Sequence, residues 1–209
     1  QVELIYKDGF QIGAEIEIPI DCSDNKSVVH SMAVALDKFG KYFVSDQPDL
    51  LIILGDRYEM FSVAVAAAMN GIPILHLHGG EATFGNYDEF IRHSITKMSL
   101  FHFTATKEFR NRVIQLGESP DRVFDLGSLG AENCLNINES KVPDEVKELK
   151  EKYFVVLFHP ETLTGSSAFS QIQTLLATLD KFSMYRFVFL GSNADTHSDI
   201  VREKIKEYL

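Results

Sequence analysis

The 209-residue sequence is poor in cysteine and in positive charge, and it has no long hydrophobic run. Its two cysteines, Cys22 and Cys134, do not stand at a metal-binding or redox spacing, so they favour free thiols in a cytoplasmic protein over a disulfide. A net charge of −10 argues against broad nucleic-acid binding and against an anionic membrane as a partner, although a local basic site could hold a phosphate. No apolar run reaches the length of a membrane span. No signal-peptide pattern opens the chain, and Gln1 in place of Met leaves a removed leader as an open alternative.

What the sequence does contain is a regular alternation of short apolar runs and helical patterns. Runs that are hydrophobic almost throughout are typical of parallel strands covered on both faces. We expect such strands at residues 50–54, 72–77, 100–105 and 123–126. Helical spacing predicts helices at residues 27–43, 59–69, 88–99 and 107–116, and a short edge strand is expected at residues 15–18. The alternation indicates an α/β fold with a doubly wound parallel sheet.

A second alternation follows a charged connector at residues 141–152. We therefore expect a Rossmann-like domain over residues 1–140 and a second one over residues 153–209. The second unit has only two evident strands, at residues 153–158 and 186–190. Two parallel strands do not make a stable sheet with its own core, so this unit is expected to be truncated.

Charged residues follow the ends of two predicted strands, where ligands bind in open α/β sheets. Asp56 could act as a base, hold a ligand hydroxyl or cap the next helix. Arg57 could bind a phosphate or pair with a neighbouring acid. Glu81 follows two glycines, which suits an acid or base as well as a solvated loop residue.

His76 and His78 are two residues apart on a strand and are therefore expected to point to one face. With Glu81, Asp88 or His93 they could form a metal site; the alternative is a pair of hydrogen-bonded structural imidazoles.

Asp88, Glu89, Arg92 and His93 open a predicted helix. The two acids suit the positive end of the helix dipole, and Arg92 stands four residues after Asp88, as in an intrahelical ion pair.

The second unit places polar residues after its own strands. His159 follows the first of them, and Ser192 and Asn193 follow the second. If both units present their strand ends to a common cleft, these residues face the first unit across a space that suits a nucleotide-sized ligand.

The strings GDRYEM, HLHGGE, DEFIRHSITKMSLFHF and GSLGAEN resemble the hydrolysing UDP-N-acetylglucosamine 2-epimerases of sialic-acid biosynthesis. The resemblance implies two Rossmann-like domains in a glycosyltransferase-B-like fold, with the substrate between them. It implies conversion of UDP-N-acetylglucosamine to N-acetylmannosamine and UDP, by anti elimination to 2-acetamidoglucal followed by hydration. Positioned acids and bases are required, and no cofactor or metal is expected. The family's opening phosphate-contacting loop and its closing serine- and glycine-rich loop are missing here. The first strand is therefore expected to be missing and the C-terminal domain to be truncated.

The resemblance also implies roles for individual residues. Asp56, Asp88 and His159 match catalytic positions of the family, with the histidine near the leaving phosphate. In animal relatives a catalytic glutamate stands where this chain has His78, so either His78 or Glu81 takes that role. We predict a catalytic set and a set that binds substrate: Asp56, Glu81, Asp88 and His159 for catalysis; Arg57, His78, Arg92, His93, Ser192 and Asn193 for the substrate.

Three alternatives stay open. One is a UDP-N,N′-diacetylbacillosamine 2-epimerase of legionaminic-acid synthesis, another is a nucleotide-sugar glycosyltransferase of the same fold, and the third is a metal hydrolase built on His76, His78 and Glu81. The expected partner is a UDP-sugar, with no nucleic acid and no membrane, in a cytoplasmic homo-oligomer (dimer or tetramer) when full length.

Overall fold

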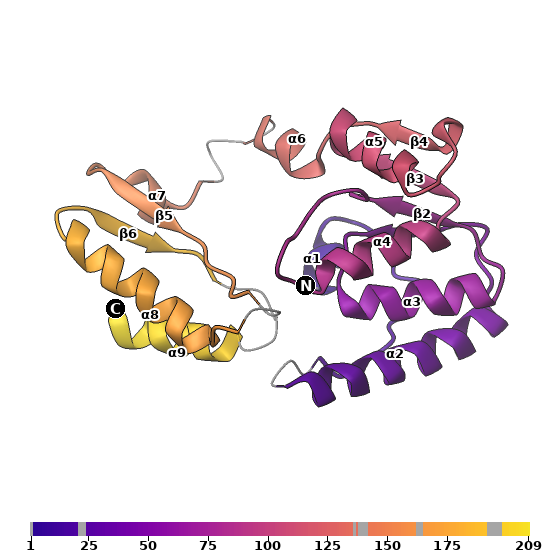
Figure 1. Cartoon of the computed structure of the whole chain (residues 1–209), viewed down its shortest axis with the longest axis horizontal. Helices are drawn as coiled ribbons and strands as arrows, with labels where there is room; N and C mark the ends of the chain where they lie inside the picture. Colours follow the sequence, from indigo (N-terminus) through magenta and orange to yellow (C-terminus); the bar gives the residue numbers. More distant parts are fainter. Residues whose placement is uncertain (1, 21–23, 136, 138–141, 162–164, 192–197) are drawn as a thin grey trace.

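A computed structural model describes residues 2–20, 24–135, 137, 142–161, 165–191 and 198–209. It contains two parallel sheets (Figure 1). The first has the order β1-β2-β3-β4, with β1 at Leu51–Leu54, β2 at Ile74–Leu77, β3 at Phe101–Thr104 and β4 at Val123–Asp125. The second pairs β5, Tyr153–Val156, with β6, Arg186–Phe189. Every predicted strand that follows residue 50 is confirmed, because these apolar runs are long enough to pair side by side.

Helices connect the strands of the first sheet in the predicted order. They are α3 at Tyr58–Met69, α4 at Asp88–Met98 and α5 at Lys107–Gln115, and β4 follows a 3₁₀ turn at Pro120–Arg122. The helix α2, Asn25–Ser45, precedes β1 and packs on α3 (Figure 1). Since consecutive parallel strands need crossover helices, this order positions successive strand ends at one edge of the sheet.

The N-terminal residues differ from the prediction. A short helix α1 spans Val2–Lys7. The strand expected at residues 15–18 is wrong, because that segment pairs with no strand in the described part of the chain. Its contact with the rest of the fold includes the Lys38 ammonium, which donates to the Glu17 carbonyl. Alternating polarity over four residues is too short a pattern to select a strand by itself.

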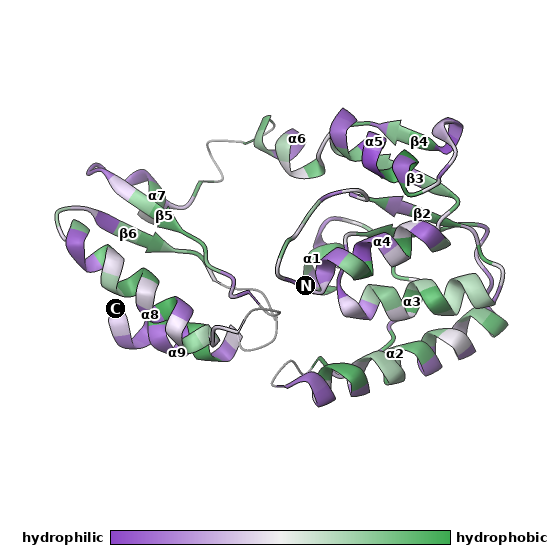
Figure 2. Cartoon of the chain, in the orientation of Figure 1, coloured by the Kyte–Doolittle hydropathy of each residue, from purple (hydrophilic) through white to green (hydrophobic). Residues whose placement is uncertain are grey.

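The core lies between the first sheet and its helices. Ile53 and Ile74 point to this side and are buried against α3 and α4. Ala64 and Ala67 of α3 are fully buried, so their small side chains let the helix approach its neighbours closely. Figure 2 shows this helix as largely hydrophobic or neutral along its length. The helix predicted at residues 59–69 is confirmed.

The opposite face of the first sheet is uncovered by the described residues. Ile52, Leu54 and Leu126 are 58%, 56% and 64% exposed. The expectation that these strands are buried on both faces is therefore only half right for this chain. The other side chains of this bare face extend the same apolar surface: Leu50, Leu75, Phe101, Phe103 and Phe124. A continuous apolar surface of this kind is normally covered in a soluble protein.

The second sheet is covered on one side by α8, Ala168–Leu179, and by α9, Ser198–Tyr208. Ile172 and Val201 are fully buried between these helices and the strands, while Phe154 and Val155 of β5 remain exposed. The short helices α6, Leu129–Leu135, and α7, Asp144–Lys147, lie between the two sheets in the sequence, and a 3₁₀ turn at Asp180–Phe182 follows α8. The two-stranded sheet agrees with the expected incomplete second unit. No helix within the described segments is long and apolar enough to cross a membrane.

Candidate functional site

The end of β1 carries the first predicted site residue, Asp56. Gly55 turns the chain with φ of 79°, and its N–H donates to the Leu77 carbonyl at 3.1 Å. The Asp56 carboxylate then forms an ion pair with the guanidinium of Arg92 on α4. The N-cap residue of α3 is Arg57, so Asp56 does not cap this helix. Its carboxylate pairs with Arg92 instead.

Arg92 connects the strand end to the loop that precedes α4. Its NH1 donates to the Glu81 carbonyl at 3.0 Å and its NH2 to Thr83 Oγ1 at 2.8 Å. The side chain is only 4% exposed. Burial, with a smaller contribution from Arg112, lowers the pKa of Arg92 to about 10, so the guanidinium is charged at neutral pH. A buried cation paired with a partly exposed carboxylate gives this edge a fixed positive charge beside an acid.

Glu89 holds the same loop and was not predicted as a site residue. Its Oε2 accepts the Thr83 N–H at 2.6 Å and lies 3.4 Å from Arg92 NH1. Its Oε1 lies 3.1 Å from Nε2 of His93, which must carry the hydrogen since a carboxylate only accepts. The sequence signal was present: Arg92 and His93 stand three and four residues after Glu89, on one helix face. From the sequence, Glu89 was instead assigned to the positive end of the helix dipole.

His76 is buried within the fold and does not share a face with His78. Its Nε2 lies 2.8 Å from the Gly55 carbonyl, which can only accept, so Nε2 carries the hydrogen. Its Nδ1 lies 3.1 Å from the Thr96 hydroxyl, which then donates. Burial lowers the pKa of His76 to about 4, so the ring is neutral at pH 7. His76 is the hydrogen-bonded structural imidazole that the sequence left as an alternative.

The two histidines separate because β2 ends at Leu77. His78 has φ of 64°, in the left-handed region, and this turns its side chain to the bare face. The expectation of a shared face is therefore wrong. Among the residues that the structure describes, no three or more histidines, cysteines or acids gather in a way that could hold a metal ion. With both nitrogens of His76 engaged, the proposed histidine pair for a metal does not form.

The neutral state of His76 predicts a pH-dependent stability. An unfolded histidine has a pKa near 6.5, so between pH 6.5 and 4 protons bind preferentially to the unfolded state. Stability should be complete above pH 6.5 and fall by about 3 kcal/mol as the pH approaches 4. We expect His76→Gln, which keeps a neutral donor and acceptor, to be less stable at pH 7 but to lose less stability on acidification. Thermal unfolding of both full-length proteins from pH 7.5 to 4.5 measures this, and parallel curves would contradict it.

Arg57 forms an ion pair with a neighbouring acid, Glu59, which was the alternative to phosphate binding. Its Nε and NH2 donate to the two carboxylate oxygens of Glu59 at 3.1 and 2.8 Å. The Glu59 side chain is nearly buried, whereas Arg57 is about one third exposed. A role for Arg57 in substrate binding stays a prediction.

The remaining predicted residues come from both units. Asp88 opens α4 and is half-buried, and His159 is exposed after β5. The loops that carry them meet: a Cβ placed on Gly85 would lie 3.5 Å from Cδ of Glu161. The structure therefore brings the segment after β5 next to the segment before α4. Ser192 and Asn193 lie outside the described residues.

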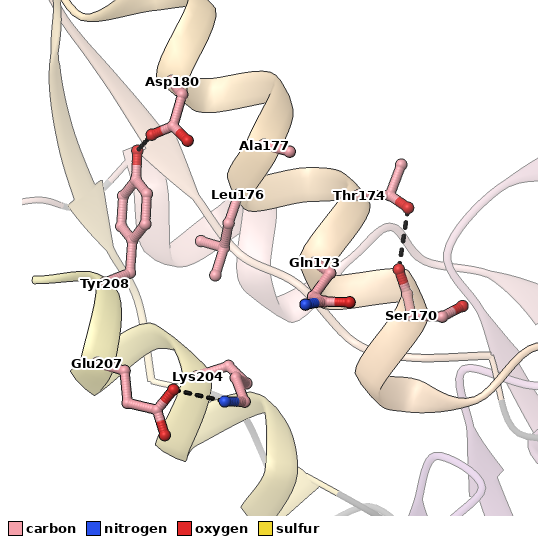
Figure 3. Close-up of a pocket in the computed structure, with 9 residues that line it drawn as sticks. All are labelled: Ser170, Gln173, Thr174, Leu176, Ala177, Asp180, Lys204, Glu207 and Tyr208. Carbon is pink, nitrogen blue, oxygen red and sulfur yellow. Dashed lines mark hydrogen bonds and ion pairs between the residues drawn. The ribbon is translucent and has the colours of Figure 1, made fainter.

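A wide groove of about 680 Å³ lies elsewhere, between α8 and α9 (Figure 3). None of the predicted site residues lines it. Tyr208 donates to Asp180 at 2.9 Å and Lys204 donates to Glu207 at 2.5 Å, so these polar side chains bind one another. We regard it as the outer surface of a helix pair, distinct from the strand-end site.

The model of the family described as UDP-N-acetylglucosamine 2-epimerase matches residues 1–209. The chain belongs to this family. An Escherichia coli relative, "Polysialic acid biosynthesis protein P7", is 49% identical over 99% of this chain and 54% of its own length. A Campylobacter jejuni relative, "GDP/UDP-N,N'-diacetylbacillosamine 2-epimerase (hydrolyzing)", is 38% identical over 98% of this chain and 55% of its own length. The chain thus spans about half the length of these curated relatives.

Solved structures confirm the fold class. A putative UDP-N-acetylglucosamine 2-epimerase from Listeria monocytogenes superposes with a TM-score of 0.73 at 16% identity, over 100% of this chain and 56% of that one. The Neisseria meningitidis enzyme, whose structure is described as bound to UDP-GlcNAc, superposes with a TM-score of 0.68 at 19% identity. The match covers 88% of this chain and 53% of that one. The fold is therefore α/β with Rossmann-like units of the glycosyltransferase-B-like type, present here as part of the family's full length.

Proposed function

We propose that the full-length protein carrying this segment is a hydrolysing 2-epimerase that converts UDP-N-acetylglucosamine to N-acetylmannosamine and UDP. The Asp56–Arg92 ion pair carries the proposal. It sets a partly exposed acid beside a buried cation at the strand ends of a family member, where a UDP-sugar would meet the acid. Relatives with polysialic-acid and hydrolysing names support the hydrolytic form over simple interconversion of UDP-sugars.

The proposed chemistry is an anti elimination followed by hydration. The C2 proton leaves, the C1–O bond breaks and UDP departs with its electron pair, which yields 2-acetamidoglucal. Water then adds at C1 while C2 is protonated on its other face. Because the C2 proton is weakly acidic, cleavage of the C1–O bond should run ahead of its removal, which places positive charge near C1.

We assign carboxylates of the first unit and a histidine of the second to this chemistry. Asp56 and Asp88 would stabilise the charge at C1 and exchange protons, and His159 would stand near the leaving phosphate. Contacts to the substrate would come from both units: Arg57, Arg92, His93, Ser192 and Asn193. We further propose a cytoplasmic homo-oligomer as the working form.

A second candidate is a UDP-N,N′-diacetylbacillosamine 2-epimerase. It is favoured by relatives whose names state that sugar, from Campylobacter jejuni at 38% identity and Legionella pneumophila at 31%. Both reactions use the same elimination and differ in the substituents of the sugar.

One experiment tests the hydrolytic mechanism and chooses the sugar. The full-length protein is incubated with each UDP-sugar in D₂O, and the products are identified by NMR. We expect release of UDP and of a free 2-epimerised hexosamine with one solvent deuterium at C2. A product that keeps its UDP would overturn the hydrolytic form. Turnover that requires an added acceptor would instead indicate a glycosyltransferase.

A further inference from the structure

His78 leaves the strand in a conformation that few residues adopt. Its φ of 64° lies in the left-handed region, which costs a residue other than glycine roughly 1–2 kcal/mol. Its N–H still donates to the Phe103 carbonyl at 2.9 Å, so the turn is fixed at the end of the sheet. A strained backbone at a strand end is a common feature of functional positions.

The side chain of His78 is held by Glu81. Nδ1 lies 2.8 Å from Oε1 of Glu81, and a carboxylate at this distance accepts a hydrogen from the ring. In the neutral ring this leaves Nε2 without a hydrogen, as a base. The hydrogen bond that the structure shows for the ring is this one at Nδ1. A carboxylate that orients a histidine in this way also stabilises the imidazolium that forms when Nε2 takes up a proton.

His78 lines a cavity of about 360 Å³ on the bare face of the first sheet, next to the end of β2. Ile52 and Leu77 supply part of its apolar lining, and Ser128 and Glu132 supply polar side chains. This volume is within the range of roughly 300–1,000 Å³ typical of small-molecule sites.

The His78–Glu81 pair is physically connected to the Asp56–Arg92 site. The carbonyl of Glu81 accepts from Arg92, whose other bonds include the one to Asp56. Arg112 NH1 donates at 2.5 Å to the carbonyl of Gly80, the preceding residue. Two guanidinium groups therefore hold the short turn that carries Glu81, and the carboxylate is fixed relative to both the strand end and α4.

We propose that His78, positioned by Glu81, is the proton-transfer residue that takes the C2 proton in the elimination step. This rests on the proposed epimerase function and assigns the role that the sequence left open between the two residues. His78 Nε2 accepts the proton, the C2–H electron pair becomes the second bond between C1 and C2, and UDP leaves with the C1–O pair. Glu81 is then a positioning residue and does not touch the substrate. Protonation at the opposite face of C2 falls to another acid of the site.

The test uses full-length variants and separates the two half-reactions. His78→Gly suits the left-handed backbone, so it removes the imidazole without adding strain. We expect it to slow UDP release by roughly 10²- to 10⁴-fold with little change in KM, while hydration of added 2-acetamidoglucal in the presence of UDP persists. Imidazole in the buffer should restore part of the elimination rate. His30→Ala, at an exposed histidine of α2, is the matched control and should leave the rate unchanged.

A double-mutant cycle tests the positioning role of Glu81. Glu81→Ala alone should slow elimination by roughly 10- to 100-fold. In the His78→Gly background it should cause no further loss, because Glu81 acts through the ring. Equal losses in both backgrounds would show that Glu81 is itself the acid or base and would overturn the proposal. Unimpaired elimination in His78→Gly would also overturn it, while the proposed function would fail separately if the wild-type protein formed no free hexosamine.

Discussion

Asp56→Asn in the full-length protein is expected to lower turnover by about 10³-fold, with a smaller effect on KM. The substitution keeps the size of the side chain and removes its charge beside the buried guanidinium of Arg92. If Asp56 stabilises positive charge at C1 or exchanges a proton, an amide cannot replace it. Steady-state release of UDP measures the loss.

Two further variants separate chemistry from folding. Asp56→Asn also leaves the charge of Arg92 poorly compensated, which by itself would destabilise the protein. The double variant Asp56→Asn/Arg92→Gln removes both charges and should regain stability without regaining turnover. Asp37→Asn, in the exposed ion pair with Lys41, is the control and should change neither stability nor turnover. Recovery of turnover in the double variant would show that Asp56 is only the counterion of Arg92.

Gly80→Ala is expected to destabilise the protein by more than about 4 kcal/mol, so that little soluble protein accumulates. Gly80 has φ of 82°, and a Cβ there would lie 2.3 Å from the Phe109 carbonyl oxygen and 2.9 Å from Cγ2 of Val113. The backbone of the turn after His78 is thus pressed against α5, and only glycine fits. Urea unfolding or soluble yield measures the effect.

Gly71→Ala is the matched control for this substitution. Gly71 has φ of 70°, but nothing lies within 4 Å of a Cβ placed there. It should therefore cost only the left-handed backbone penalty, roughly 1–2 kcal/mol. Equal losses at both positions would refute the close approach of the turn to α5.

The tight turn explains why the site depends on α5, which carries none of the predicted site residues. Gly80 and Arg112 bind the turn to this helix, and the turn presents Glu81 to His78. A substitution on α5 that pushed the turn outward would change the His78–Glu81 distance without touching either residue.

The bare face of the first sheet bears on the activity of these 209 residues. Ile52 and Leu126 lie on a surface that parallel sheets normally bury, and the chain spans about half the length of its relatives. For this reason each activity experiment uses the full-length protein.

The sequence alone determined the strand and helix order from residue 50 onward, since hydrophobic runs and helical periodicity are local properties of the chain. It also placed Asp56, Glu81 and Asp88 after strands or at a helix start. Strings such as GDRYEM and HLHGGE indicated the family by resemblance. These are features that neighbouring residues specify. The position of Glu89 on one helix face with Arg92 and His93 was likewise readable, although it was not recognised.

Only the tertiary structure decided which of these side chains meet. Arg92 reaches Asp56 across 36 positions in the sequence, and spacing within its own helix could not indicate that partner. The roles of His76 and His78 depended on where β2 ends, because one left-handed residue moves a side chain from the buried face to the bare face. The alternation of side chains along a strand predicts their direction only within the strand, and these site residues lie just after the strand ends.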